Sequence, residues 1–247
     1  MDMVEEFDKF NKVTVLGPGM IGASFSRALK ATNLAAHVVG CARNESVLRA
    51  SVDNGYIDSC ETDPAKACQE SDLVMLATPV DAFAPLVNAI SSSLKKGAIV
   101  IDAGSVKGSL AYNIDSLMPE GVSYVPCHPI AGNEGSGPDA SSPDLFKGAA
   151  CIITPLEGTD PQALKRVSRM WEALGAKVES LDPMRHDKVY ALVSHFPHLV
   201  MYALVNAVSE IDATALRFTG GGFDDSTRIA KSSPALWRTI CMMNSNN

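Results

Sequence analysis

The stretch VTVLGPGMIG, which occupies residues 13–22, decides the fold. Its first four residues are typical of a buried β-strand, and helical spacing follows it. In between, Gly17 permits a tight turn, Gly19 lets the backbone approach a pyrophosphate, and Gly22 allows close helix–strand packing. The new helix would offer backbone N–H groups, those of Met20 and Ile21 among them, to phosphate oxygens. Such a glycine pattern also occurs by chance, so the strand before it and the helix after it carry the prediction of a dinucleotide-binding turn.

The N-terminal three quarters of the chain alternate short β-branched runs with segments of helical spacing. The runs are residues 13–16, 38–40, 73–77, 99–102, 122–126, 151–154 and 177–181. Alternating strands and helices predict a parallel sheet covered on both faces, in a Rossmann-type doubly wound α/β arrangement. We therefore expect a dinucleotide-binding domain over residues 1–181.

The strand signal disappears after residue 181. Residues 184–211 form a long stretch with helical spacing, in which Pro197 should kink the helix because it donates no backbone hydrogen bond. Ser233 and Pro234 then form a helix cap followed by proline at the first helical position. We expect an all-helical domain over residues 182–247 that is short and truncated.

Composition limits the class of protein. Of the 247 residues, 46% are hydrophobic and 20% are charged, as is ordinary for a soluble globular protein. The net charge of −7 and the absence of basic runs argue against a nucleic-acid partner. Six scattered cysteines favour reduced thiols over disulfides or a zinc site, so we expect no metal. The sequence has no signal-peptide core and no apolar run near the ~20 residues of a membrane span, so we expect a cytoplasmic protein with no membrane partner.

The second predicted strand leads into residues that select the cofactor. An NAD-binding fold places an acid near the end of this strand to hold the ribose hydroxyls. Here residues 39–44 read VGCARN, and the first carboxylate is Glu45. Arg43, followed by Asn44, can bind a 2′-phosphate through a charge-assisted hydrogen bond worth roughly 1.5–3 kcal/mol. We expect NADP as the preferred cofactor; NAD is the alternative, with Arg43 a solvated side chain that opens the next helix.

Two other strand ends should complete the cofactor site, because ligands bind at the carboxyl edge of an open parallel sheet. Thr78, Pro79 and Val80 follow one predicted strand, and the proline should turn the chain across the crevice. Gly104 and Ser105 follow the next strand, and Ser105 would stand where the nicotinamide arrives. As the alternative, Thr78 and Ser105 are ordinary helix caps.

Four segments together resemble the bacterial prephenate/arogenate dehydrogenase family: 104–107 (GSVK), 128–137 (HPIAGNEGSG), 194–198 (SHFPH) and 225–230 (DSTRIA). The resemblance covers nearly the whole chain. It implies a step of tyrosine biosynthesis, the oxidative decarboxylation of prephenate or arogenate to 4-hydroxyphenylpyruvate or tyrosine with hydride transfer to NAD(P)⁺. It also implies that residues 182–247 bind substrate and form a homodimer, although family members carry further helices past the point where this sequence stops.

His128 matches the catalytic histidine of the family. Removal of the proton of the substrate alcohol suits a neutral imidazole with a pKa of about 6.5. Pro129 stiffens the backbone beside His128, and Ser105 would bind the same hydroxyl or orient the imidazole. As the alternative, His128 is a structural histidine at a strand end.

The two carboxylates of the substrate require fixed cations. Arg228 matches the family arginine that follows a threonine, and its guanidinium can grip a carboxylate in a bidentate way. Lys107 is the second candidate. By resemblance, His198 lines the substrate pocket, whereas His195 meets Glu134 across the mouth and gates access. As the alternative, the two cations are solvated and the two histidines only satisfy backbone carbonyls.

Three further residues carry expectations. Trp237 corresponds to an aromatic residue that in relatives reaches the active site from the partner subunit, with ordinary helix packing as the alternative. His37 and His186 are expected at the surface. Asp224 stands where relatives usually have a basic residue, and an acid there would pair with the ammonium of arogenate.

Two other functions stay open from the residues alone. A β-hydroxyacid dehydrogenase also has a Rossmann domain, but its catalytic lysine lies in a glycine-spaced helical motif that the segment around Lys231 lacks. A non-catalytic dinucleotide-binding module would need neither His128 nor Ser105.

Overall fold

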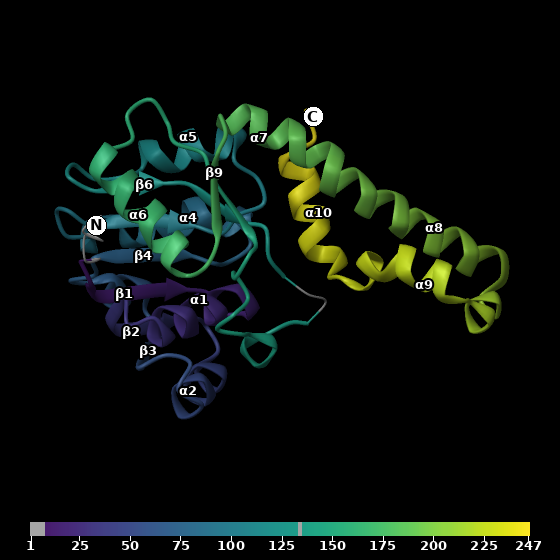
Figure 1. Cartoon of the computed structure of the whole chain (residues 1–247), viewed down its shortest axis with the longest axis horizontal. Helices are drawn as coiled ribbons and strands as arrows, with labels where there is room; N and C mark the ends of the chain where they lie inside the picture. The colour runs from purple at the N-terminus through teal and green to yellow at the C-terminus, as the bar shows by residue number, and fades with distance from the viewer. Residues whose placement is uncertain (1–7, 133–134) are drawn as a thin grey trace, which may run out of the picture.

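The structure, a computed structural model, describes residues 8–132 and 135–247. Six parallel strands form the main sheet in the order β3-β2-β1-β4-β5-β6 (Figure 1). They are β1 (Phe10–Leu16), β2 (Ala35–Cys41), β3 (Ser59–Glu61), β4 (Leu73–Leu76), β5 (Ile99–Asp102) and β6 (Ser123–Val125). This is the strand order of the Rossmann fold, so the predicted doubly wound α/β class is confirmed.

Helices cover both faces of this sheet because successive side chains of a strand point to opposite sides. Val13 and Val15 of β1 enter one core with Trp171, whereas Leu16 enters the other with Phe83. The helices around the sheet are α1 (Met20–Ala31), α2 (Glu45–Asp53), α3 (Pro64–Cys68), η1 (Val80–Ala82), α4 (Phe83–Ile90), η2 (Ser91–Ser93), α5 (Gly108–Ser116), η3 (Pro138–Ala140) and α6 (Pro161–Ala173).

The last predicted strands do not extend the main sheet. They form a second, three-stranded sheet of β7 (Cys127–Pro129), β8 (Ala150–Ile153) and β9 (Lys177–Ser180), in which β7 and β8 are antiparallel. The expected single parallel sheet is therefore wrong in this part. Pro126 separates β6 from β7, and since proline has no N–H to donate, it interrupts the ladder there.

The helical part begins directly after β9 and projects from the sheet as an arm (Figure 1). Its elements are α7 (Pro183–Tyr190), η4 (Ala191–His195), α8 (Phe196–Asp212), η5 (Ala215–Phe218), α9 (Gly221–Thr227), η6 (Arg228–Lys231) and α10 (Pro234–Met243). The irregularity predicted at Pro197 takes the form of a π-helix at η4, just before a proline that cannot donate to the carbonyl four residues earlier. Ser233 caps α10 as predicted, accepting from the backbone N–H of Leu236 at 3.4 Å.

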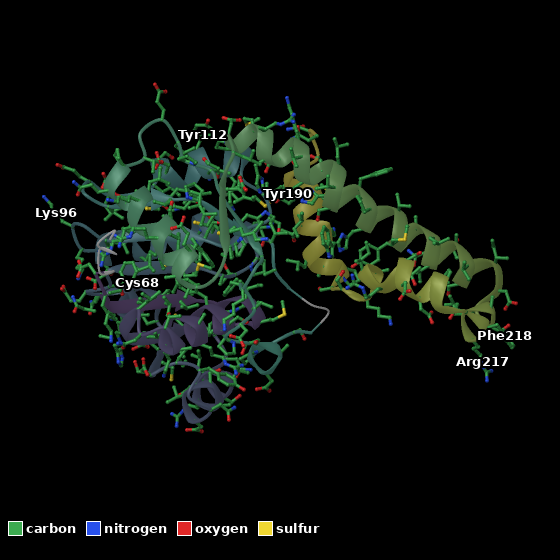
Figure 2. All side chains as sticks on the ribbon, in the orientation of Figure 1. Cys68, Lys96, Tyr112, Tyr190, Arg217 and Phe218 are labelled. Atoms are coloured by element: carbon green, nitrogen blue, oxygen red, sulfur yellow. The ribbon has the colours of Figure 1, made fainter. Side chains whose placement is uncertain are left out.

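One continuous helix runs through α7, η4 and α8 from Pro183 to Asp212, and it is long and apolar enough to cross a membrane by length and composition. Its most apolar 18-residue window has a mean hydropathy of 1.4 and is 6% buried. The expectation that no apolar run approaches membrane-spanning length is therefore wrong. The apolar side chains lie in the open along the arm, whose far tip carries Arg217 and Phe218 (Figure 2). The helix thus needs either a lipid or a protein surface to cover it.

Candidate active site

A cleft of about 1590 Å³ opens at the carboxyl edge of the main sheet, beside the turn between β1 and α1. Among its lining residues are six of the residues predicted to bind the cofactor: Gly17, Gly19, Arg43, Asn44, Thr78 and Pro79. The helix α10 closes the cleft from the other side through Leu236 and Thr239. Segments from both ends of the chain thus form one cavity, large enough for a dinucleotide.

The three glycines of the turn have different surroundings. Gly17 has a φ of +88°, and a Cβ there would lie 2.9 Å from the carbonyl oxygen of Ala77. A Cβ on Gly22 would lie 2.5 Å from the carbonyl oxygen of Gly17, so this position serves close packing of α1 on the sheet. Around Gly19, in contrast, a Cβ would meet nothing within 4 Å. The space over Gly19 is open to the cleft, as the approach of a pyrophosphate requires.

The N-terminus of α1 is suited to a phosphate. The cap residue Gly19 provides no side-chain hydrogen bond, and the first turn carries no acidic residue. The first-turn N–H groups, which include those of Met20 and Ile21, therefore donate no hydrogen bond to a cap side chain. The positive end of the helix can bind an anion instead. Both side chains are half-buried beside the cleft without lining it.

Two side chains at the cleft support the fit of a nicotinamide dinucleotide. The hydroxyl Oγ1 of Thr78 is buried and has no hydrogen-bond partner in the part of the chain that the structure describes. Arg43 is exposed at the cleft. The side-chain oxygen of Asn44, by contrast, caps α2 by accepting from the N–H groups of Ser46 and Val47 at 3.1 and 3.3 Å. A ligand hydroxyl would satisfy Thr78, and a phosphate would pair with Arg43.

Besides Met20, Ile21 and Gly22 at the start of α1, two predicted cofactor residues farther along the chain do not line the cleft. Val80 is 4% exposed and packs in the core. Gly104 is buried, and a Cβ there would lie 2.8 Å from the Val80 side chain and 2.9 Å from Asp102 Oδ1. Their prediction as cofactor contacts is corrected to a packing role, because β5 passes too close to η1 to leave room for a side chain.

The prediction that Lys107 is a substrate-binding cation is wrong. Its side chain is 1% exposed, and Nζ donates to Asp102 Oδ1 and to the carbonyl oxygen of Gly104, both at 2.6 Å. Asp102 also accepts from the hydroxyl of Tyr124 at 2.7 Å, and burial together with this carboxylate raises the pKa of the tyrosine well above its usual value. The lysine charge is therefore neutralised inside the fold, where it joins β5 to the start of α5.

His128 lies on β7, just past the carboxyl edge of the main sheet, and is 8% exposed. Its Nδ1 is 2.8 Å from Nε2 of His186, and its ring lies 4.8 Å from that of Tyr190, centroid to centroid. Figure 2 places Tyr190 at the junction of the arm with the sheet domain. Burial, and next the charge of Lys107, lower the pKa of His128 well below its usual value, so the imidazole is neutral at physiological pH.

The residue that orients His128 differs from the one predicted. Ser105 is half-buried, and no hydrogen bond joins its hydroxyl to His128 among the described residues. His186 takes that place instead. The expectation of a surface His186 is wrong, since its side chain is 0% exposed and its Nδ1 lies 2.8 Å from Asp187 Oδ1. The pattern-based signal for this pair is weak: two polar residues on a helix with charged neighbours are typical of a solvated face. His37 is exposed, as expected.

The histidines of the arm separate into two environments. His198 is half-buried, its Nδ1–H donates to the carbonyl oxygen of Ser194 at 2.9 Å, and its ring stacks on Trp237 with centroids 3.4 Å apart. This tryptophan comes from the same chain rather than from a partner. His195 is 4% exposed and its Nδ1 accepts from Asn244 Nδ2 at 3.1 Å, so its predicted place at the pocket mouth is wrong. Burial lowers the pKa of His195 to about 4.

Arg228, Glu134 and Asp224 are the other residues with an expected role toward the substrate. Arg228 is exposed at the start of η6, which packs on α8, the helix of His198. Glu134, the predicted partner of His195, lies outside the described residues. Asp224 is exposed, and its Oδ1 accepts from the hydroxyl of Thr219 at 2.8 Å.

The parts expected of a dinucleotide-dependent dehydrogenase are present: a Rossmann cleft, a neutral imidazole just past the carboxyl edge of the same sheet, and an apolar helical arm. His128 itself does not line the cleft. Comparison with known families agrees with this class of protein. The prephenate dehydrogenase nucleotide-binding domain matches residues 25–180, and the prephenate dehydrogenase dimerization domain matches residues 182–247. The chain therefore belongs to the prephenate dehydrogenase family. It is an oxidoreductase of tyrosine biosynthesis, whose reaction is the oxidative decarboxylation of prephenate or arogenate.

Individual relatives are similar over most of their length. The cyclohexadienyl dehydrogenase of Zymomonas mobilis is 35% identical over 95% of this chain and 81% of its own. The prephenate dehydrogenase of Bacillus subtilis is 31% identical over 94% of this chain, which spans 64% of that protein. The crystal structure of Aquifex aeolicus prephenate dehydrogenase in complex with hydroxyphenyl propionate and NAD⁺ has 38% identity and a TM-score of 0.89, covering 96% of this chain and 83% of that one. These similarities remove the β-hydroxyacid dehydrogenase and the non-catalytic module as alternatives.

Proposed function

We propose that His128 is the proton acceptor for the oxidation of prephenate or arogenate by this chain. The observation that carries the proposal is the environment of its ring. Nδ1 is hydrogen-bonded to His186, whereas Nε2 has no hydrogen bond with any described residue and is not fully buried. One ring nitrogen is thus fixed and the other is available to a ligand. Because burial keeps the ring neutral, that nitrogen can take a proton.

The residues of the chain have separable tasks in this reaction. The bound nicotinamide would accept the hydride from the ring carbon that bears the hydroxyl. His128 removes the proton of that hydroxyl, and Ser105, which lies on the loop after β5, would bind the same oxygen. Loss of carbon dioxide then makes the ring aromatic, so the protein chiefly positions groups and moves one proton.

The substrate carboxylates are assigned to the arm. Arg228 would pair with one of them, and His198, stacked on Trp237, would line the pocket with its Nε2, which has no hydrogen bond with a described residue. Glu134 is kept as a candidate at the mouth, on the strength of the family resemblance alone. His195 supports this wall from inside, through its hydrogen bond with Asn244.

NADP is the proposed preferred cofactor. The support is Arg43 at the cleft and the lack of an acid between Val39 and Asn44. Ala42→Asp would place a carboxylate at the end of β2 and should shift the ratio of kcat/KM values toward NAD by about tenfold or more, since an arginine–phosphate contact is worth roughly 1.5–3 kcal/mol. A native enzyme that prefers NAD would refute this part.

The apolar helix is proposed to be the contact between two copies in a homodimer of a cytoplasmic enzyme. The support is the match of residues 182–247 to a dimerization domain and the exposure of large side chains along α8, such as Phe196 at 62% and Leu199 at 50%. A second copy would cover this surface and remove any need for lipid. Light scattering should report twice the chain mass.

The deciding experiment measures formation of the reduced nicotinamide with prephenate and with arogenate. The native chain should be active with at least one of them. His128→Asn should lower kcat by about 10²–10⁴-fold and leave the dissociation constant of the cofactor unchanged, because it removes only the base. His37→Gln is the matched control at an exposed histidine. A near-native kcat for His128→Asn would remove His128 from its role.

A further inference from the structure

The proposed base and two side chains behind it form a buried, hydrogen-bonded line. His128 Nδ1 is 2.8 Å from His186 Nε2, and His186 Nδ1 is 2.8 Å from Asp187 Oδ1. The exposed fractions are 8%, 0% and 3% in that order. Two elements far apart in the sequence, β7 and α7, supply the line, so it exists only in the folded chain.

The carboxylate at the far end is fixed in position by its surroundings. Asp187 Oδ1 accepts from the backbone N–H of Lys107 at 2.8 Å, at the N-cap of the nine-residue helix α5. Its other oxygen, Oδ2, lies against Gly108, where a Cβ would collide with it. Two hydrogen-bond donors and the start of a helix thus hold the Asp187 carboxylate against His186.

This fixed acceptor determines the protons along the line. A carboxylate can only accept, so His186 carries its proton on Nδ1 and presents the lone pair of Nε2 to His128. His128 must then carry its own proton on Nδ1. The lone pair of His128 is left on Nε2, the nitrogen that has no hydrogen bond with a described residue. Burial lowers the pKa of both imidazoles, which keeps this doubly neutral arrangement at physiological pH.

We propose that His186 and Asp187 are positioning residues that form a proton relay with His128. The relay fixes the tautomer in which His128 Nε2 is the base. When Nε2 takes the proton of the substrate hydroxyl, the proton on Nδ1 passes to His186 Nε2. The new imidazolium then lies beside the Asp187 carboxylate, and the charge of the three groups changes from −1 to zero. The inference rests on the proposed function, which supplies the alcohol and the nicotinamide that takes its hydride.

The relay explains how a deeply buried imidazole can act as a base. Burial alone would make His128 a poor proton acceptor, because a charged ring there would have no compensating partner. Transfer to His186 places the positive charge 2.8 Å from a carboxylate. Protonation of His186 from solvent would remove the base. The added proton on His186 Nε2 would be donated in a hydrogen bond to His128 Nδ1, so His128 would carry its own proton on Nε2 and could not accept another there. Acid should therefore inactivate the enzyme through His186.

Other titratable groups face this line from every element packed on it. They are Lys107 beside α5, Asp102 of β5, Tyr190 of α7, His195 of η4 and Cys151 of β8. The lysine and the aspartate are ion-paired at 2.6 Å, so their charges largely cancel. Asp187 is left as the carboxylate of the line, and it contacts the imidazole of His186 directly.

Asp187→Asn tests the relay with little structural change, because both hydrogen bonds to Asp187 end on Oδ1 and an amide oxygen there can accept them. Only the charge is lost. We expect kcat and kcat/KM of the full chain to fall together by about 10²-fold. The acid limb of the kcat profile should move to lower pH by about 1–3 units, since a neighbouring carboxylate favours the protonated ring. Glu172→Gln, an exposed carboxylate on α6, is the charge-matched control.

A second variant and a spectroscopic measurement guard against a folding defect. His186→Gln can still accept from His128 Nδ1–H but cannot take a proton, and kcat should fall by about tenfold or more. Nitrogen NMR of labelled histidine should place the unprotonated nitrogen of both rings at Nε2. Native kcat and an unmoved acid limb in folded Asp187→Asn, or a proton on His128 Nε2 in the resting enzyme, would overturn the relay. A native chain inactive on both substrates would refute the proposed function, while the nitrogen signals would still decide the tautomer.

Discussion

Replacement of Lys107 by methionine distinguishes a structural ion pair from a substrate contact. The lysine and Asp102 are 1% and 0% exposed, and removal of one member of such a pair leaves a buried charge at a cost of about 3–5 kcal/mol. Asp102 keeps its bonds from Tyr124 and from the N–H of Gly104, at 2.7 and 2.6 Å. We therefore expect the lower end, about 3 kcal/mol, or roughly 6–12 °C in Tm for a chain of this size.

Urea and thermal unfolding of Lys107→Met measure this loss, with exposed Lys188→Met on α7 as the control. The double variant Asp102→Asn/Lys107→Met should recover most of the stability, because no buried carboxylate is then left without its cation. A loss below about 1 kcal/mol, combined with a raised KM for substrate, would refute the ion-pair reasoning and return Lys107 to the substrate site.

Three further predictions follow from particular contacts. Gly22→Ala should destabilise the chain by about 1–3 kcal/mol in urea unfolding, because the new Cβ would lie 2.5 Å from a backbone oxygen. Gly19→Ala, where a Cβ meets nothing within 4 Å, should leave stability unchanged and weaken only dinucleotide binding, as measured by titration. Burial lowers the pKa of His195 from 6.5 to about 4, so between these pH values the unfolded chain binds the extra proton. Unfolding titrations should find stability falling by up to about 1.4 kcal/mol per unit as the pH drops from 6.5 to 4, with a smaller slope in His195→Gln. If Asp224 pairs with the ammonium of arogenate, kcat/KM of the native chain should be higher for arogenate than for prephenate, and Asp224→Lys should reverse this order. Equal kcat/KM values for the two substrates in the native chain would refute the pairing.

Local patterns were sufficient for the Rossmann core. The strand over residues 13–16 and the turn from Gly17 to Gly22 follow from the geometry of single elements, and the structure confirms them. The assignment of the last two predicted strands, 151–154 and 177–181, to the main sheet is wrong: past Pro126 they form a second sheet with β7, which the pattern did not predict. A pattern of β-branched residues identifies a strand, but it does not say which neighbour that strand will pair with.

The site was predicted less completely, for a physical reason. Whether a charged or imidazole side chain is solvated or buried depends on partners distant in sequence. Lys107 was assigned to the substrate and is buried with Asp102, while His186 was assigned to the surface and is buried against His128. The dipeptide His186-Asp187 has no periodicity that separates it from an exposed helix face. Only the meeting of α7 with β7 and the start of α5 gives it a role.

From the place of α10 we expect the dinucleotide and the substrate to bind cooperatively. Leu236 and Thr239 of this ten-residue helix line the dinucleotide cleft, and Trp237 between them stacks on His198 in the arm. Whichever ligand docks first restricts α10 and so lowers the entropy that the other must lose. Thermodynamic reciprocity then requires that each ligand tighten the other by the same factor.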